Sequence, residues 1–176
     1  MIEGFYTAIE GAVRTATGPV GLVLIGIYSF LIAFVLPLPS EIVLAPASHL
    51  NLGLPTEANL ALIVLASGLG KAAGSVFAFH IGQEAKRSGP VIRLVRQSRF
   101  DVVSWSEKKA VRLAQEYGYI GLAAALSVPG FPDTISIYAF SVLERDYYRF
   151  AAATFVGSVG RLVVTIAGFA GVTALL

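Results

Sequence analysis

The stretch from residue 15 to residue 40 contains no charged side chain. Three further apolar stretches follow it, at 58–82, 117–143 and 150–176, and stretches of this length are typical of segments that lie in lipid. Of all residues 56% are hydrophobic and only 14% are charged, so the chain lacks the polar surface of a soluble domain. The sequence therefore predicts one small integral membrane domain over residues 1–176.

Residues 1–17 precede the apolar region and are predicted to form an interfacial helix. They carry two glutamates and a single arginine, so they lack the basic start of a secretory signal, and we expect them in the mature protein. Their apolar side chains recur at helical spacing, which favours a short helix on the membrane surface. These side chains are Ile2, Phe5, Tyr6, Ile9 and Val13.

Residues 83–116 hold most of the positive charge. A basic cluster can bind nucleic acid, but the cytoplasmic loops of membrane proteins also collect lysine and arginine. We therefore predict a cytoplasmic, amphipathic connection lying partly on anionic lipid of a prokaryotic cell membrane, with no nucleic-acid partner. Its cations are Lys86, Arg87, Arg93, Arg96, Arg99, Lys108, Lys109 and Arg112.

The segments on either side of this connection show the same order of features, which predicts two repeats, at 18–82 and 117–176. In each, an apolar run meets a proline pair followed by an acid: Pro37-Leu38-Pro39-Ser40-Glu41 in the first and Pro129-Gly130-Phe131-Pro132-Asp133 in the second. Each then continues into a span with a glycine and a cation in its middle, Gly70-Lys71 and Gly160-Arg161. The acid and the cation stand at positions 41 and 71 in the first repeat and at positions 133 and 161 in the second, so their separations nearly agree.

Four prolines, Pro37, Pro39, Pro129 and Pro132, are expected to break the helices, because proline lacks a backbone donor and restricts the residue before it. Non-helical backbone at membrane depth is tolerated only where protein buries it or where it lines a wet cavity. We therefore predict an all-α membrane fold of two inverted repeats, each a re-entrant helical hairpin followed by a transmembrane helix. Residues 117–128 would rise only about 18 Å, which favours re-entry, whereas 20–36 would rise about 25 Å and leave re-entry or crossing open.

Four ionisable residues are predicted to lie at membrane depth: Glu41, Lys71, Asp133 and Arg161. Each would cost about 2.5 to 3.5 kcal/mol or more in contact with lipid, so they must face the protein interior or pair. One interpretation is a structural quartet that neutralises itself in pairs. The other is a transport site in which the cations attract an anionic head group while one acid exchanges a proton, since burial favours the protonated form of a carboxyl group.

The cations and neighbouring hydroxyls suit a phosphate. A guanidinium grips phosphate with a planar fork of donors, while an ammonium acts as a compact charge. Ser40, Ser127 and Thr134 stand beside the breaks and could add donors, or they could bond to backbone carbonyls freed by the breaks. No cofactor or metal site is predicted, and the absence of HExxH and GxSxG motifs argues against an enzyme.

Three sequence elements occur together in this chain: Phe34-Val-Leu-Pro-Leu-Pro-Ser-Glu41, a glycine-rich span ending in His80-Ile-Gly82, and Leu126-Ser-Val-Pro-Gly130. Over roughly residues 20–170 they resemble the DedA superfamily, also called VTT or SNARE-associated Golgi proteins, and in particular a compact, YqaA-like branch. The resemblance implies a protein that moves or scrambles lipids, polyprenyl phosphates included, through paired re-entrant hairpins. The resemblance also implies that Glu41 is a site residue.

The chain departs from this family in two places. Many bacterial members carry arginines three residues before and three after the proline of the proline-glycine pair, where this chain has Leu126 and Pro132. The span that often holds an acid after its glycines holds Lys71 instead. Head-group specificity and proton coupling are therefore not carried over from the family.

Three functions remain open on the sequence. The first is a transporter or scramblase that moves phosphate-bearing lipids, polyprenyl phosphate or phospholipid, between leaflets at the interface of the two repeats. The second is a proton-coupled carrier of a small ion, and the third is a membrane scaffold without transport. The lipid, the direction of movement, the driving ion and the oligomeric state, a homo-oligomer included, stay undetermined.

Overall fold

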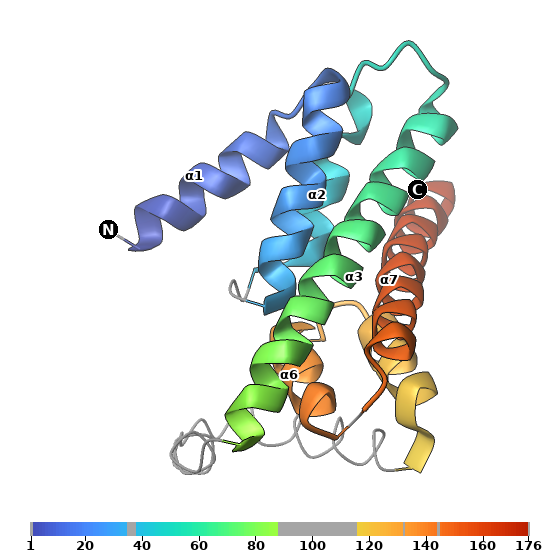
Figure 1. The fold of residues 1–176 in the computed structure, drawn as a ribbon. Coiled ribbons are helices and arrows are strands. Elements are labelled where there is room, and N and C mark those ends of the chain that lie inside the picture. Colours follow the sequence, from blue (N-terminus) through green and yellow to red (C-terminus); the bar gives the residue numbers. More distant parts are fainter. Residues whose placement is uncertain (1, 35–37, 88–115, 132, 144, 176) are drawn as a thin grey trace.

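The computed structural model describes residues 2–34, 38–87, 116–131, 133–143 and 145–175, and the regular structure in these ranges is entirely helical (Figure 1). The all-α prediction is confirmed for this part of the chain. In order, the elements are α1 (Ile2–Arg14), α2 (Gly18–Phe34), the 3-10 helix η1 (Ser40–Ser48), α3 (Thr56–Arg87), a helix over 116–127, α6 (Asp133–Leu143) and α7 (Tyr147–Leu175).

Among the described residues, two helices are long and apolar enough to cross a membrane, over Thr56–Glu84 of α3 and Tyr147–Gly171 of α7. The apolar helix α2 is shorter, with 17 residues. On all three helices large apolar side chains face outward, as expected for surfaces covered by lipid tails. They include Val20, Val23, Ile27, Leu65, Leu69, Phe77, Val156, Val163 and Phe169.

The helices form two groups that run in opposite directions. Helices α2 and α3 both begin at the upper end of Figure 1, and the chain between them returns to that end through η1. The helix over 116–127 and α7 both begin at the lower end, with α6 leading back down between them. The last residues of α2 and of the helix over 116–127 therefore both lie between the two ends of the long helices. The junction between α2 and η1 is called the first break below, and the junction between the helix over 116–127 and α6 is called the second break.

Glycines let each long helix pack closely on its partner. A Cβ atom at Gly74 of α3 would lie 2.3 Å from the carbonyl oxygen of Phe30 in α2. A Cβ atom at Gly157 of α7 would lie 2.7 Å from the carbonyl oxygen of Ala123 in the helix 116–127. Close approach of this kind compensates for the missing hydrophobic drive between helices in lipid, because it increases van der Waals contact.

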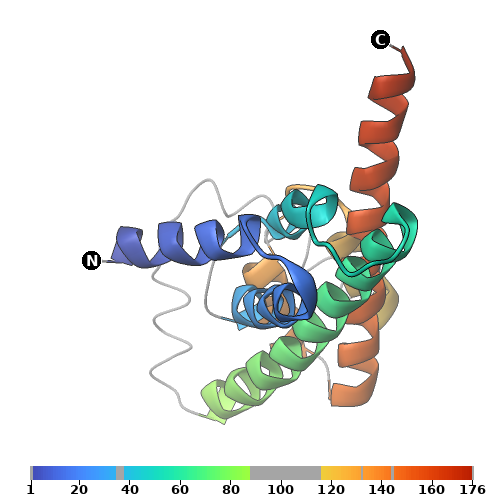
Figure 2. The same ribbon diagram turned by 90° about the horizontal axis from the view of Figure 1, so that it is seen from above.

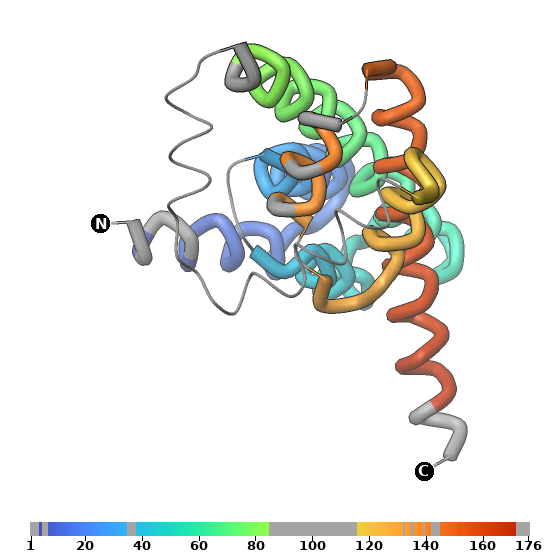
Figure 3. The backbone as a smooth tube through the Cα atoms, turned by 90° about the horizontal axis from the view of Figure 1, so that it is seen from below, coloured from blue at the N-terminus to red at the C-terminus, as the bar shows by residue number. Residues whose placement is uncertain are grey.

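Helix α6 is stacked on the end of α2. It lies directly below α2 in Figure 1 and overlies it when the molecule is seen from below (Figure 3). Two side chains of α6 donate hydrogen bonds to the last turn of α2: the Thr134 hydroxyl to the Ile32 carbonyl at 2.8 Å and the Tyr138 phenol to the Phe34 carbonyl at 2.9 Å. The carbonyls at the end of a helix lack hydrogen-bond partners within that helix, and here α6 supplies the donors. These bonds therefore connect the end of α2 with α6.

In the described part of the chain the buried apolar side chains form two clusters. The cluster near α2 and η1 includes Ile25, Ile32, Val43 and Ile63, and the cluster near α6 includes Leu122, Leu126, Ile137, Phe140 and Phe150. Seen from above, α1 and the C-terminal part of α7 extend away from this core in different directions (Figure 2).

Several sequence expectations differ from the structure in detail. The segment after Pro39, expected as the second half of a helical hairpin, is a 3-10 helix, and Pro46 within it has no backbone N–H to donate. Residues 83–87, expected in the basic connection, continue α3. Pro39 and Pro129 lie in non-helical segments, whereas Pro37, Pro132 and the basic residues at 88–115 lie outside the described residues.

Candidate functional site

Three buried charges meet where the two breaks face each other. Asp133, the first residue of α6, accepts a hydrogen bond from the ammonium of Lys71 in α3. The other oxygen of the same carboxylate, Oδ1, lies 2.7 Å from Arg161 Nη2 of α7. All three side chains are almost completely buried, with 4% of Asp133 and 2% of each cation exposed. The cluster joins both long helices to one break and carries a formal net charge of +1.

The guanidinium of Arg161 is also fixed by two other elements. Its Nε donates to the carbonyl of Leu126 at 2.8 Å, and its Nη1 donates to the hydroxyl of Ser40 at 3.2 Å. Leu126 lies in the last turn of the helix 116–127, whose carbonyls have no helical partners ahead of them. Arg161 therefore contacts both breaks: it binds Ser40 at the first, and Leu126 and Asp133 at the second.

Glu41 stands apart from this cluster. Its side chain is half-buried, and its Oε1 accepts a hydrogen bond from the backbone N–H of Gly130 at 3.3 Å. Gly130 has φ +74°, a conformation that glycine adopts readily and that aims this N–H across the interface. Within the described residues no ion pair joins Glu41 to Lys71 or Arg161. Lys71 and Arg161 thus share Asp133 in a triad, with Glu41 beside it, rather than forming two separate acid–cation pairs among the described residues.

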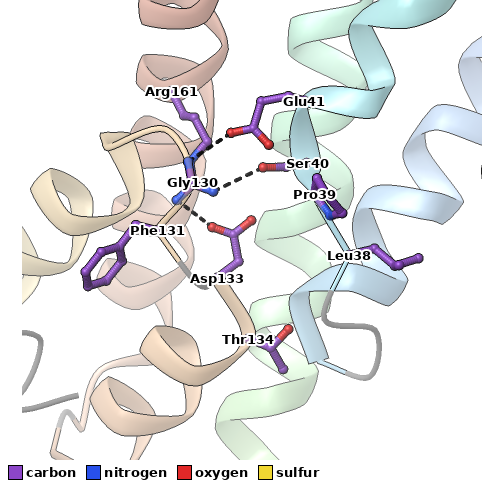
Figure 4. Close-up of a pocket in the computed structure, with 9 residues that line it drawn as sticks. All are labelled: Leu38, Pro39, Ser40, Glu41, Gly130, Phe131, Asp133, Thr134 and Arg161. Atoms are coloured by element: carbon purple, nitrogen blue, oxygen red, sulfur yellow. Dashed lines mark hydrogen bonds and ion pairs between the residues drawn. The ribbon is translucent and has the colours of Figure 1, made fainter. Parts of the chain in front are cut away.

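A cavity of about 240 Å³ opens between the two breaks (Figure 4). Glu41 and Ser40 border it from the first break, and Asp133 and the Gly130 turn border it from the second. Arg161 reaches it from α7, whereas Lys71, which contacts Asp133, is not part of the lining. The complete lining consists of Leu38, Pro39, Ser40, Glu41, Gly130, Phe131, Asp133, Thr134 and Arg161.

The hydroxyls named from the sequence have different roles in the structure. Ser40 lines the cavity and accepts a hydrogen bond from Arg161. Thr134 also lines the cavity, yet its hydroxyl donates to the Ile32 carbonyl. The Ser127 hydroxyl donates to the Ala123 carbonyl at 2.8 Å and approaches the Gly157 carbonyl at 3.4 Å. Thr134 and Ser127 thus follow the alternative in which hydroxyls satisfy backbone carbonyls near a break.

Sequence reasoning did not identify two backbone groups of this site, the Leu126 carbonyl and the Gly130 N–H. The proline before Gly130 signals a turn, because a Pro-Gly pair favours a residue with positive φ. That signal could have located the Gly130 turn, but not its contact with Glu41, which lies 89 positions away along the chain. Nothing in the sequence around Leu126 indicates that an arginine from α7 binds its carbonyl.

The arrangement offers an anion a place next to fixed donors. Arg161 provides planar N–H groups suited to phosphate oxygens, and the surrounding burial weakens screening by water. Within the described residues, no three His, Cys, Asp or Glu side chains come together as metal ligands. The chemistry of the site is therefore that of charge pairing and hydrogen bonding.

Two apolar spans and a buried charge cluster between broken helices define an integral membrane protein with a polar site inside the membrane domain. The VTT domain family matches residues 38–170, well over half of the chain. The chain belongs to this family, which includes the DedA and SNARE-associated proteins and consists generally of non-enzymatic membrane proteins. Neither a search of curated proteins nor a search of solved structures returned a match.

Proposed function

We propose that this protein moves phosphate-bearing lipids, either polyprenyl phosphate or phospholipid, between the two leaflets as a transporter or scramblase. The observation that carries the proposal is the position of the charge cluster. Lys71 stands close to the middle of its span, which runs from Thr56 to Glu84, so it lies near mid-membrane. Buried charges at this depth are costly, and in membrane proteins they mark substrate or ion pathways.

The directions of the helices support an inverted-repeat architecture. The pair α2 and η1 enters and leaves at one end of the molecule, and the pair formed by 116–127 and α6 enters and leaves at the other. In this proposal both pairs are re-entrant hairpins whose tips meet at mid-membrane, the first hairpin included. A site at the interface of inverted repeats, built from broken helices, is typical of secondary transporters.

The contents of the cavity support a phosphate group as the recognised part of the lipid. The Arg161 guanidinium borders the cavity together with the Ser40 hydroxyl, and both can donate to phosphate oxygens. The lipid tail would remain among the outward-facing apolar side chains of α3 and α7. The small size of this site agrees with a compact, YqaA-like member of the family. Coupling of lipid movement to a proton on Glu41 is part of the same proposal.

The distribution of charge supports an orientation with the basic connection in the cytoplasm. Helix α3 ends and the helix 116–127 begins at the lower end of Figure 1, and in this proposal that end faces the cytoplasm. Arg145 and Arg149 flank the start of α7 at the same end. Positive residues gather on the cytoplasmic side of membrane proteins, and a prokaryotic cell membrane is the proposed location.

One observation favours the alternative of a scaffold without transport. Asp133 already contacts both buried cations, so the cluster can hold the breaks together without any substrate. A proton-coupled carrier of small ions remains the other alternative. Both predict that lipid movement across a bilayer is no faster with the protein than without it.

The test is reconstitution of the full chain into liposomes with fluorescent phospholipid and fluorescent polyprenyl phosphate. Wild type is compared with Glu41→Gln and Arg161→Gln, and the matched controls are Glu57→Gln and Arg149→Gln, because Glu57 and Arg149 are exposed outside the site. We expect lipid movement in wild type and in both controls, and at least a tenfold slower rate in the two site variants. Wild-type vesicles that behave like empty vesicles, with folded protein incorporated, would exclude the proposed function.

A further inference from the structure

Asp133 has surroundings that differ sharply from those of Glu41, the other acid of the site. Only 4% of the Asp133 side chain is exposed, and both of its oxygens lie next to cations. The half-buried Glu41 carboxylate contacts a neutral N–H instead. The two acids therefore have different tasks, and only Asp133 holds the groups that would attract an anion.

The bonding within the triad is incomplete. Asp133 Oδ1 and Arg161 Nη2 are in ion-pair contact, yet both atoms are fully buried, and within the described structure neither has a hydrogen bond of good geometry. A buried polar atom without a well-aligned partner is unfavourable, because it has lost its contact with water. Arg161 Nη2 is thus a buried donor that a better-placed acceptor could use.

The carboxylate of Asp133 resembles the group that the site is proposed to bind. A carboxylate and a phosphate both present oxygens that accept from a guanidinium and an ammonium. Asp133 lines the cavity, whereas Lys71, whose ammonium contacts the same carboxylate, is not among the lining residues. Rotation about χ1 between staggered positions is the movement by which the carboxylate would leave the two cations.

We infer that Asp133 is a built-in competitor of the substrate: its carboxylate occupies the phosphate subsite on Lys71 and Arg161, and a phosphate group binds there by displacing it. This inference rests on the proposed function for the identity of the ligand as a lipid. The subsite itself requires only a phosphate group, whether on a lipid or free in water. Competition of this kind keeps the buried cations paired between substrates and hastens release of the phosphate.

The charge count suggests two variants that separate competition from net charge. Asp133→Asn leaves two buried cations without their counter-ion and raises the charge of the triad from +1 to +2. Glu41→Gln raises the charge of the whole site by the same amount, but it leaves the Asp133 carboxylate in contact with both cations. If only the net charge governs binding, the two variants bind phosphate alike; if Asp133 competes, Asp133→Asn binds more tightly than Glu41→Gln.

The experiment is calorimetric titration of the purified full chain in detergent with inorganic phosphate and, separately, with dihexanoyl phosphatidic acid. We expect Asp133→Asn to bind at least one of these ligands about tenfold or more tightly than wild type and Glu41→Gln do, because close opposite charges are strongly coupled. Asp133→Glu should bind as wild type does, and Asp146→Asn, an exposed acid, is the control for the substitution. The ligand whose affinity rises more identifies the source as lipid or free phosphate.

A measurement on Asp133 itself covers the case in which the variants do not fold. The chain contains only three aspartates, Asp101, Asp133 and Asp146, so Asp101→Asn/Asp146→Asn leaves Asp133 as the single one. With ¹³C-labelled aspartate, infrared difference spectra should show its carboxylate band shifting when phosphate or the short-chain lipid is added. A bound ligand with an unshifted band, or unchanged affinity in folded Asp133→Asn, overturns the inference.

The outcomes for the inference and for the proposed function are distinguishable. Wild type that moves no lipid in liposomes, with tighter phosphate binding in Asp133→Asn than in Glu41→Gln, retains the competing carboxylate but removes the lipid-transport function. Lipid movement in wild type, with the same phosphate affinity in all folded variants and no band shift, retains the function and removes the competition. If both hold, Asp133→Asn should also move lipid more slowly, because it releases the phosphate more slowly.

Discussion

Gly70 of α3 packs directly on the backbone of Gly26 in α2, so closely that a Cβ atom at position 70 would lie 2.2 Å from the Gly26 carbonyl oxygen. A contact with backbone cannot be relieved by rotating a side chain, so a larger residue must push the helices apart. Because Lys71 follows Gly70 directly, the same displacement would shift its ammonium away from Asp133.

The substitution Gly70→Ala is therefore expected to lower the free energy of unfolding by about 2 to 3 kcal/mol, in the range for overpacked cores. Gly26→Ala is the matched control on the other side of the contact, since its Cβ would have its nearest neighbour, the Ala66 carbonyl oxygen, at 3.8 Å. The measurement is thermal unfolding in detergent followed by circular dichroism. Equal losses in the two variants would contradict the close helix contact.

A second glycine contact predicts different effects at two neighbouring positions of α7. A Cβ atom at Gly157 would lie 2.7 Å from both the Ala123 carbonyl oxygen and Leu126 Cβ, whereas a Cβ atom at Gly160 would meet only Ser127, at 2.7 Å from its rotatable hydroxyl. We expect Gly157→Ala to cost about 2 kcal/mol and Gly160→Ala clearly less. Gly168→Ala, which would meet nothing within 4 Å, is the neutral control in the same unfolding measurement.

The cation positions of the site were predictable from the sequence, and the reason is physical. Lys71 and Arg161 interrupt apolar spans, where a charge must be buried, and both are buried in the structure. Their shared use of Asp133 was not predictable, because spacing along the chain does not reveal how α3 and α7 approach each other. The position of Glu41 beside the triad depends on the Gly130 turn, and the spacing along the chain does not reveal this contact either.

The helical fold was predictable to a similar extent. Apolar length indicated the spans in α3 and α7, and the resemblance to the VTT domain family is confirmed by the match over 38–170. The 3-10 character of η1 was missed because the apolar pattern after Pro39 does not distinguish helix types, although Pro46 limits the α-helical bonding there. The stacking of α6 on α2 rests on long-range hydrogen bonds that no local pattern indicates.

The shared carboxylate predicts an asymmetry between the charges of the triad. Lys71→Met leaves Asp133 and Arg161 as a neutral pair, whereas Asp133→Asn leaves two buried cations without a counter-ion. Removing one partner of a buried pair costs about 3 to 5 kcal/mol when an uncompensated charge remains. We expect a loss of that size for Asp133→Asn and a smaller loss for Lys71→Met in thermal unfolding. Lys71→Met as the more destabilised variant would show that Asp133 is not the shared counter-ion.

The stacking of α6 on α2 predicts an effect of one phenol. The Tyr138 hydroxyl donates to the Phe34 carbonyl at 2.9 Å, and Tyr138→Phe leaves that carbonyl without this donor. We expect a loss of about 1 kcal/mol in the free energy of unfolding, the usual value for such a bond. Tyr117→Phe, at an exposed tyrosine, is the control and should change stability little. If both variants unfold alike, the bond between the two breaks contributes nothing to stability.

Gly130 and Gly53 provide a pair that separates backbone strain from function. Both have positive φ, +74° and +72°, and at both a Cβ atom would meet nothing within 4 Å, so Gly130→Ala and Gly53→Ala should each cost about 1 to 2 kcal/mol. Only Gly130 donates its N–H to Glu41 and lines the cavity. Lipid movement in liposomes should therefore slow several-fold in Gly130→Ala and stay near the wild-type rate in Gly53→Ala, at matched amounts of folded protein. Equal rates in the two variants would mean that the Gly130 turn takes no part in transport, because the strain would then have the same consequence at both turns.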